Sequence, residues 1–199
     1  MKIYCLGDSL TFGFGVKPSS RWANLVAAET GIEMINRGIS GDTAVGMLSR
    51  LGGIISEIKE AHGEPQLVFV MGGYNDYFYS GSFDTARSSI GAIIHQLLSS
   101  GIDVLAGIPA QISSADIPEN WSSLIDFRAG SAETDEYCSW LENYCRAFAV
   151  PFIDFRPCLQ DSSGKLNEDL LLDGLHPNTR GHRLMADRFI QSLKEINIL

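Results

Sequence analysis

Short runs of apolar, β-branched and aromatic residues recur along the chain, and a turn-forming Gly, Pro, Asp or Asn follows each run closely. The runs occupy residues 2–6, 33–36, 66–71, 103–108 and 151–155. Runs of this length and composition are typical of β-strands that are buried on both faces. The pattern therefore predicts five strands.

Between these runs, apolar residues recur every three or four positions, which is the repeat of an amphipathic helix. The clearest stripes lie at residues 44–58, 86–97, 137–148 and 179–196. Apolar strands that alternate with helices predict a parallel sheet covered on both faces and joined by right-handed crossovers. We therefore expect an α/β fold, a three-layer α/β/α sandwich with a five-stranded parallel sheet, formed by residues 1–199 as a single domain.

In such a sheet, ligands bind outside the carboxyl ends of the strands, so the segments that follow the strands are candidates for a functional site. Four segments qualify, at residues 7–15, 38–42, 72–76 and, ahead of the last helix, 173–178. A further segment, 110–134, also leaves a strand end, lacks clear periodicity and carries Trp121 and Phe127. It is a candidate for a lid or a pocket wall, and the sequence does not assign it a role.

The composition of the chain bears on which classes of binding partner it can have. Acidic residues outnumber basic residues by 24 to 15, which gives a formal net charge of −9. Lys and Arg form no cluster that could follow a phosphate backbone, so nucleic acid is not expected as a partner. No apolar stretch approaches the roughly 20 residues of a membrane span. Residues 1–6 show no leader, and the four cysteines lack C-x-x-C spacing, so we expect a cytoplasmic location and reduced cysteines.

Three residues on the strand-end segments have the chemistry of acyl transfer, namely Ser9, Asp173 and His176. A serine hydroxyl is a weak nucleophile until an imidazole takes its proton, and a carboxylate usually orients that imidazole. Asp173 and His176 are three residues apart, a spacing that one helical turn or a tight loop brings into contact. Each residue alone is more often a cap or an inert surface group, but together they predict a nucleophile with its acid and base.

The same segments offer hydrogen-bond donors for the oxyanion that forms in acyl transfer. Gly38 can bring its backbone N–H close to a ligand because it has no Cβ, and Asn75 can add a side-chain amide. Asp8 and Asp76 flank these positions. We expect both acids to accept hydrogen bonds from loop amides rather than to take part in catalysis.

These residues fall in four ordered blocks that resemble the SGNH hydrolases, also called GDSL esterases and lipases. The blocks are Gly-Asp-Ser-Leu-Thr at 7–11, Asn-Arg-Gly at 36–38, Gly-Tyr-Asn-Asp at 73–76 and Asp-Gly-Leu-His-Pro at 173–177. The resemblance implies a flavodoxin-like sheet, no cofactor, and Ser9 as nucleophile with Asp173 and His176. It also implies an oxyanion hole formed by the Ser9 N–H, the Gly38 N–H and the Asn75 amide.

Such an enzyme would hydrolyse esters of small molecules through an acyl-serine intermediate. The family accepts many esters, and a small chain without a long apolar insertion favours short acyl groups, including acetyl on a sugar. Two alternatives stay open at this point, an acyltransferase that passes the acyl group to an alcohol, and a flavodoxin-like module that binds a small ligand without chemistry. The oligomeric state is not readable from the sequence.

An aromatic run follows the third block and consists of Tyr74, Tyr77, Phe78 and Tyr79. These rings are candidates for a flat wall against an acyl, aryl or sugar group, and packing of the loop on its neighbours explains them equally well.

Two other kinds of site are disfavoured. Gly13-Phe14-Gly15 matches part of a dinucleotide-binding motif, but Pro18 replaces its third glycine. His62, His95 and His182 stand apart without the spacing of metal ligands, so no metal site is expected. His182 falls within the last predicted helix and is expected to be structural.

Overall fold

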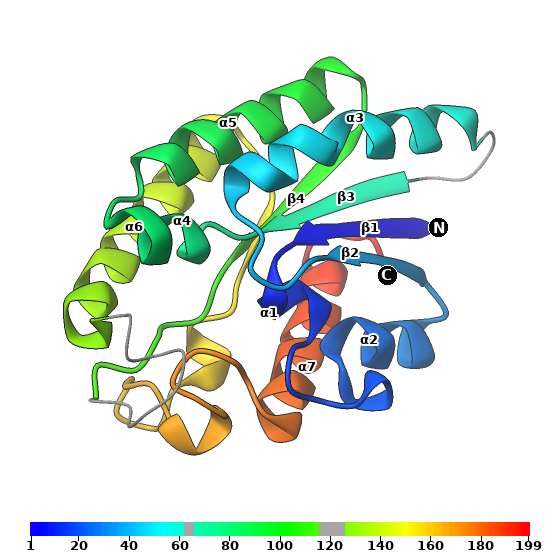
Figure 1. The fold of residues 1–199 in the computed structure, drawn as a ribbon. Helices are drawn as coiled ribbons and strands as arrows, with labels where there is room; N and C mark the ends of the chain where they lie inside the picture. Colours follow the sequence, from blue (N-terminus) through cyan, green and yellow to red (C-terminus); the bar gives the residue numbers. More distant parts are fainter. Residues whose placement is uncertain (62–65, 116–125) are drawn as a thin grey trace.

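The computed structural model of the protein describes residues 1–61, 66–115 and 126–199. Five strands form one parallel sheet in the order β2-β1-β3-β4-β5 (Figure 1). The strands are β1 (Lys2–Gly7), β2 (Glu33–Gly38), β3 (Gln66–Met71), β4 (Asp103–Ile108) and β5 (Phe152–Asp154). The predicted five-stranded parallel sheet is confirmed, and its strand order is that of flavodoxin-like folds.

Helices cover both faces of the sheet, which confirms the predicted three layers. They are α1 (Ser9–Phe12), α2 (Trp22–Thr30), α3 (Ala44–Glu60), α4 (Tyr74–Ser80), α5 (Asp84–Ser99), α6 (Phe127–Ala147) and α7 (Thr179–Glu195). Helices α3, α5 and α6 lie over one face, and α2 and α7 lie over the other (Figure 1). Within the described ranges, no helix combines the length and the apolar character needed to cross a bilayer.

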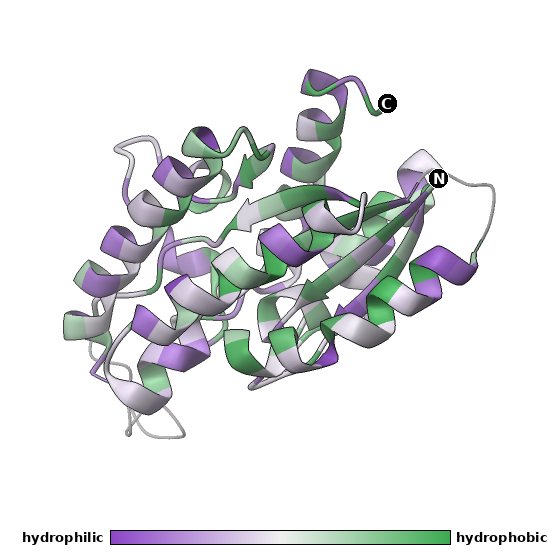
Figure 2. Ribbon diagram, turned by 90° about the horizontal axis from the view of Figure 1, so that it is seen from above, coloured by the Kyte–Doolittle hydropathy of each residue, from purple (hydrophilic) through white to green (hydrophobic). Residues whose placement is uncertain are grey.

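The strands owe their apolar runs to burial on both faces. β1 and β3 are buried almost throughout, whereas the edge strand β2 is only partly buried, and apolar residues accordingly gather on the central strands (Figure 2). Between the sheet and the α2/α7 layer, the rings of Trp22, Phe69 and Phe189 pack with centroids 5.1 to 5.4 Å apart. This aromatic cluster fixes α2 and α7 against the sheet that carries the candidate site.

Four helices differ from the pattern that the sequence predicts. α2 lies outside every predicted stripe. α1 and α4 have only four and seven residues, which is too short to show an apolar stripe. α6 begins at Phe127, well before the predicted stripe, because the side chain of Asp126 accepts the Ala129 N–H at 2.9 Å and caps the helix. The final part of the segment 110–134 is therefore helical, while Trp121 and the rest of residues 116–125 lie outside the described residues.

Candidate active site

Ser9 stands at the carboxyl end of β1, where the chain turns directly into α1. Ser9 is the first residue of that helix, and Asp8 caps it by accepting the Leu10 N–H at 2.9 Å. The turn needs a glycine before it, because a Cβ on Gly7 would lie 2.1 Å from Thr11 Oγ1. The sequence around Ser9 thus folds into a tight strand-to-helix turn that holds the hydroxyl at the edge of the sheet.

Ser9, His176 and Asp173 form a continuous chain of hydrogen bonds. His176 Nε2 lies 2.9 Å from Ser9 Oγ, and His176 Nδ1 lies 2.7 Å from Asp173 Oδ2. Ser9 and His176 are buried, with only 5% and 7% of their surface exposed. The structure therefore brings together the three residues that the sequence singled out, although Ser9 and His176 are 167 positions apart. A hydroxyl, an imidazole and a carboxylate in this order can move a proton from serine to histidine.

The turn that carries Asp173 and His176 is fixed by its backbone. Gly174 has a φ of 80°, a left-handed conformation that favours glycine, and its carbonyl accepts the Ser113 N–H at 2.8 Å. The carbonyl of His176 accepts the Leu172 N–H, also at 2.8 Å. Burial raises the pKa of Asp173, but hydrogen bonds from the His176 side chain and backbone outweigh burial and hold that pKa below its ordinary value. The carboxylate is thereby kept ionised beside the imidazole.

Hydrogen-bond donors share a pocket with the Ser9 hydroxyl. The pocket has a volume of about 180 Å³ and is lined by Ser9, Phe14, Ser40, Gly41, Asn75, Tyr79, Leu175 and His176. Asn75 Nδ2 donates one hydrogen to the Asp42 carbonyl at 2.8 Å, which orients the amide and leaves its second hydrogen for a ligand. In the part of the chain that the structure describes, the backbone N–H groups of Ser9 and Gly41 have no acceptor.

The structure places Gly38 outside this pocket, whereas the sequence analysis assigned it an oxyanion donor. The Gly38 N–H donates to Asn36 Oδ1 at 2.9 Å, and a Cβ at Gly38 would lie 2.3 Å from the backbone nitrogen of Phe12. Gly38 therefore allows its loop to pack closely against α1. Gly41, with a φ of 80°, is the glycine that lines the pocket. It lies two residues before Thr43, the N-cap of α3, and nothing in its residue type marks its N–H as free.

Three of the predicted wall residues, Tyr74, Tyr77 and Phe78, do not line the pocket. Tyr74 is buried, and its hydroxyl donates to the Ala110 carbonyl at 2.9 Å. Tyr77 stacks on Phe83 with ring centroids 5.1 Å apart, and Phe78 is half-buried against the core. These rings pack the loop on its neighbours, which was the alternative explanation for the aromatic run.

The aromatic walls of the pocket are Phe14 and Tyr79. The Phe14 ring lies 4.5 Å from the His176 ring, centroid to centroid, and it was not predicted as a site residue. Tyr79 is 72% exposed, and its hydroxyl lies 3.5 Å from the Gly41 carbonyl. Asn75 and Tyr79 are four residues apart on α4, so the helix turns both toward the pocket.

Two buried acids flank the site without contacting Ser9 Oγ. Asp8 accepts the Leu10 N–H, and Asp76 Oδ2 accepts the Ala44 N–H at the start of α3 at 2.8 Å. Burial raises the pKa of both carboxyl groups, that of Asp8 to about 7. Both acids hydrogen-bond loop amides, as the sequence analysis expected.

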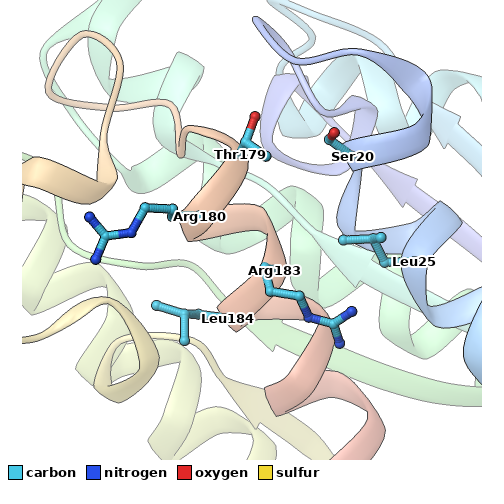
Figure 3. Close-up of a pocket in the computed structure, with 6 residues that line it drawn as sticks. All are labelled: Ser20, Leu25, Thr179, Arg180, Arg183 and Leu184. Atoms are coloured by element: carbon cyan, nitrogen blue, oxygen red, sulfur yellow. The ribbon is translucent and has the colours of Figure 1, made fainter.

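Outside the pocket, two further features bear on the choice of site. A groove of about 440 Å³ lies where the segment Pro18–Ser20 and α2 meet α7 (Figure 3), and it shares no lining residue with the pocket around Ser9. Across the described ranges, no group of three or more His, Cys, Asp or Glu side chains is arranged to hold a metal ion. The hydrogen-bonded serine is therefore the strongest candidate for chemistry.

Comparisons with known proteins show the family to which the chain belongs. The model of the GDSL-like Lipase/Acylhydrolase family matches residues 5–184. The structure is similar to that of a lipolytic protein of the G-D-S-L family from Veillonella parvula, with a TM-score of 0.78 and 26% identity over 96% of this chain and 97% of that chain.

Two characterised esterases share the fold at lower identity. An aryl esterase from M. smegmatis has a TM-score of 0.78 and 22% identity over 98% of both chains. A carbohydrate acetylesterase from Sinorhizobium meliloti has a TM-score of 0.74 and 20% identity over 100% of this chain and 99% of that chain. No curated protein matches the sequence. Because the family model spans most of the chain, from β1 into α7, the protein belongs to the GDSL-like lipase/acylhydrolase family and is a carboxylic-ester hydrolase.

Proposed function

We propose that this protein hydrolyses short-chain esters with Ser9 as nucleophile, His176 as base and Asp173 as the group that orients His176. The observation that carries the proposal is the unbroken chain of hydrogen bonds, 2.9 Å from Ser9 Oγ to His176 Nε2 and 2.7 Å from His176 Nδ1 to Asp173 Oδ2. Ser9 Oγ attacks the ester carbonyl while its proton passes to His176 Nε2, and Asp173 stabilises the imidazolium that forms.

The tetrahedral intermediate carries a negative oxygen that needs donors already in place. The Ser9 N–H, the Gly41 N–H and the second hydrogen of Asn75 Nδ2 belong to one pocket and are available for this oxygen. We therefore assign Gly41, in place of Gly38, to the oxyanion hole. As the intermediate collapses, the ester bond breaks and the leaving alcohol takes the proton from His176. Water then attacks the acyl-serine by the same route and releases the acid.

The substrate class follows from the size and chemistry of the pocket. Its volume of about 180 Å³ suits a short acyl group, and no Lys, Arg, Asp or Glu is among the described residues that line it. We infer a neutral ester with a short acyl chain, a class that includes acetyl groups on sugars. The names of the two esterases with the same fold support this class, since one acts on aryl esters and the other on acetylated carbohydrates.

The test is hydrolysis of p-nitrophenyl esters with acyl chains of two to eight carbons. Ser9→Ala should lower kcat at least about 10⁴-fold because no other group supplies the nucleophile, while its far-UV circular dichroism matches the parent. Ser88→Ala, which changes an exposed serine of α5, should retain full activity. Turnover by Ser9→Ala near that of the parent would show that Ser9 is not the nucleophile, and a preference for eight-carbon chains would contradict the proposed substrate class.

A further inference from the structure

A half-buried arginine of α3 binds three of the segments that build the pocket. The side chain of Arg50 is 24% exposed. Its Nε donates to Asp42 Oδ2 at 2.9 Å, its Nη1 to the Arg37 carbonyl at 2.7 Å and its Nη2 to the Gly7 carbonyl at 2.9 Å. One guanidinium thus spans the end of β1, the end of β2 and the loop that enters α3.

Two of these contacts lie where the ladder between β1 and β2 runs out. The Gly7 carbonyl also accepts the Ile39 N–H at 3.0 Å, and beyond this point the two chains separate, one toward Ser9 and the other toward Gly41. A backbone carbonyl has two lone pairs, so the Gly7 carbonyl can accept a side-chain donor in addition to the Ile39 N–H, and the Arg37 carbonyl can accept one as well. Arg50 supplies these donors and so sets the spacing between the two chain segments just before the backbone N–H groups of the proposed oxyanion hole.

The third contact of Arg50, to Asp42, links it to Asn75, the remaining donor of the proposed oxyanion hole. The carboxylate of Asp42 is held by Arg50, and its backbone carbonyl accepts a hydrogen from Asn75 Nδ2 at 2.8 Å. Asp42 also follows Gly41 directly in the chain. The position of Asp42 therefore determines both where the Asn75 amide points and where the Gly41 N–H lies.

We infer that Arg50 is a positioning residue for ester hydrolysis, which holds the Ser9, Gly41 and Asn75 donors at the spacing that the oxyanion requires. The inference rests on the proposed function of these donors. Arg50 does not line the pocket, so it acts through the backbone and Asp42 rather than on the substrate. A displacement of about 1 Å at a reacting group can cost about 10²-fold in rate. A lysine cannot replace the arginine, because one ammonium on a flexible stem does not span three acceptors as a planar guanidinium does.

The test is a double-mutant cycle with Arg50→Gln and Asn75→Ala, measured as kcat and KM for p-nitrophenyl acetate. Arg50→Gln alone should lower kcat on the order of 10- to 100-fold and leave KM within about threefold. Both changes disturb the same donors, so their effects should not multiply. The kcat of the double variant should be at least about fivefold higher than the kcat expected from multiplying the two single losses. Arg50→Lys should stay within about threefold of Arg50→Gln.

The matched control is Arg87→Gln, which removes a guanidinium of α5 of similar exposure, 28%, that pairs with Glu136 of α6 and does not line the pocket. This control should keep the parent kcat. An unchanged kcat in Arg50→Gln, strictly multiplicative effects, full rescue by lysine, or an equal loss in Arg87→Gln would each overturn the inference. If Arg50→Gln does not fold, Asp42→Asn takes its place in the cycle with the same expectation. An active Ser9→Ala variant would show that the proposed function itself is wrong, whereas an inactive one leaves the outcome of the cycle to decide on Arg50 alone.

Discussion

Asp173 and His176 are held to each other by hydrogen bonds between residues close in sequence. Asp173 uses Oδ2 to hold the His176 ring and Oδ1 to accept the backbone N–H of His176 at 2.8 Å. The backbone of His176 therefore orients the Asp173 carboxylate, and the carboxylate in turn orients the His176 ring. At the residue scale, the geometry of Asp173 and His176 depends on such short-range bonds, whereas we expect the choice of acyl group to depend on Phe14 and Tyr79, whose exposed rings line the pocket.

The two rings should determine how strongly an apolar acyl chain is preferred over acetyl. Each methylene that is buried contributes about 0.8 kcal/mol, so the ratio of kcat/KM for p-nitrophenyl butyrate over acetate should fall several-fold in Phe14→Ala and in Tyr79→Ala. Phe148→Ala is the control, since Phe148 is 50% exposed and does not line the pocket. A ratio that is unchanged in both pocket variants would exclude these rings from acyl binding.

Residue chemistry explains what the sequence could reveal about the site. Ser9, Asp173 and His176 were identifiable because only a few side chains can form a nucleophile, an acid and a base. Ser9 follows the first strand closely, and Asp173 and His176 lie three residues apart just before the last helix. The donor at Gly41 was not identifiable, because whether a backbone N–H is free depends on loop dihedrals that residue type does not determine. The sequence analysis therefore chose Gly38, whose N–H is already bound to Asn36 Oδ1.

At the scale of elements, α7 connects the active-site loop to the core. Asn178 caps α7 by accepting the N–H groups of Arg180 and Gly181, directly after the loop that carries His176. One turn into the helix, buried His182 accepts the backbone N–H of Trp22 at its Nδ1, at 3.3 Å, which joins α7 to the first residue of α2. The hydrogen bond between His182 and Trp22 is thus a buried polar contact between α7 and α2, beside the packed rings of Trp22 and Phe189.

The buried His182 predicts that the free energy of unfolding depends on pH. Burial, together with Arg21 and His176, lowers the pKa of His182 to about 4 from an unfolded value of about 6.5. Between these values the unfolded chain binds a proton that the folded chain does not, so the contribution of His182 to stability is lost as the pH falls from about 6.5 to 4. The loss amounts to about 2 to 3 kcal/mol at pH 4.5 relative to pH 7.

Urea unfolding of the parent and of His182→Gln at pH 7, 6, 5 and 4.5 measures this contribution. The raised pKa of Asp8, about 7, adds stability as the pH falls and opposes the effect of His182 in the parent. The titration of Asp8 is common to both proteins, so the difference between their free energies of unfolding isolates His182. A difference that does not change with pH would contradict the assignment.

Strands and helices were predictable from the sequence where burial imposes a regular pattern of apolar residues over their whole length. All five strands and the helices α3, α5 and α7 show it, because each buries a stripe or a face against the sheet. α1 and α4 carry Ser9 and Asn75 but are too short for a stripe, and they are set by tight turns at Gly7 and Gly73, which has a φ of 116°. The first turns of α6 escaped prediction because polar residues and a single cap define them.

At the scale of the whole molecule, a single site is assembled from segments that lie far apart in the sequence. Parallel strands bring their carboxyl ends to one edge, where the ends of β1, β2 and β3 and the loop before α7 carry the proposed nucleophile, donors and base (Figure 1). The chain carries a net charge of −9, yet the described residues that line the pocket include no acidic or basic group apart from His176. This combination favours uncharged esters over anionic ones.

Covalent labelling tests most directly whether Ser9 is an activated nucleophile. A fluorophosphonate probe reacts only with a serine whose proton a base removes, so intact-mass spectrometry of the labelled protein should show one adduct per chain. Peptide mapping should place that adduct on Ser9, and Ser9→Ala should take up no label. A folded parent protein that remains unlabelled, or an adduct on another serine that persists in Ser9→Ala, would contradict the account.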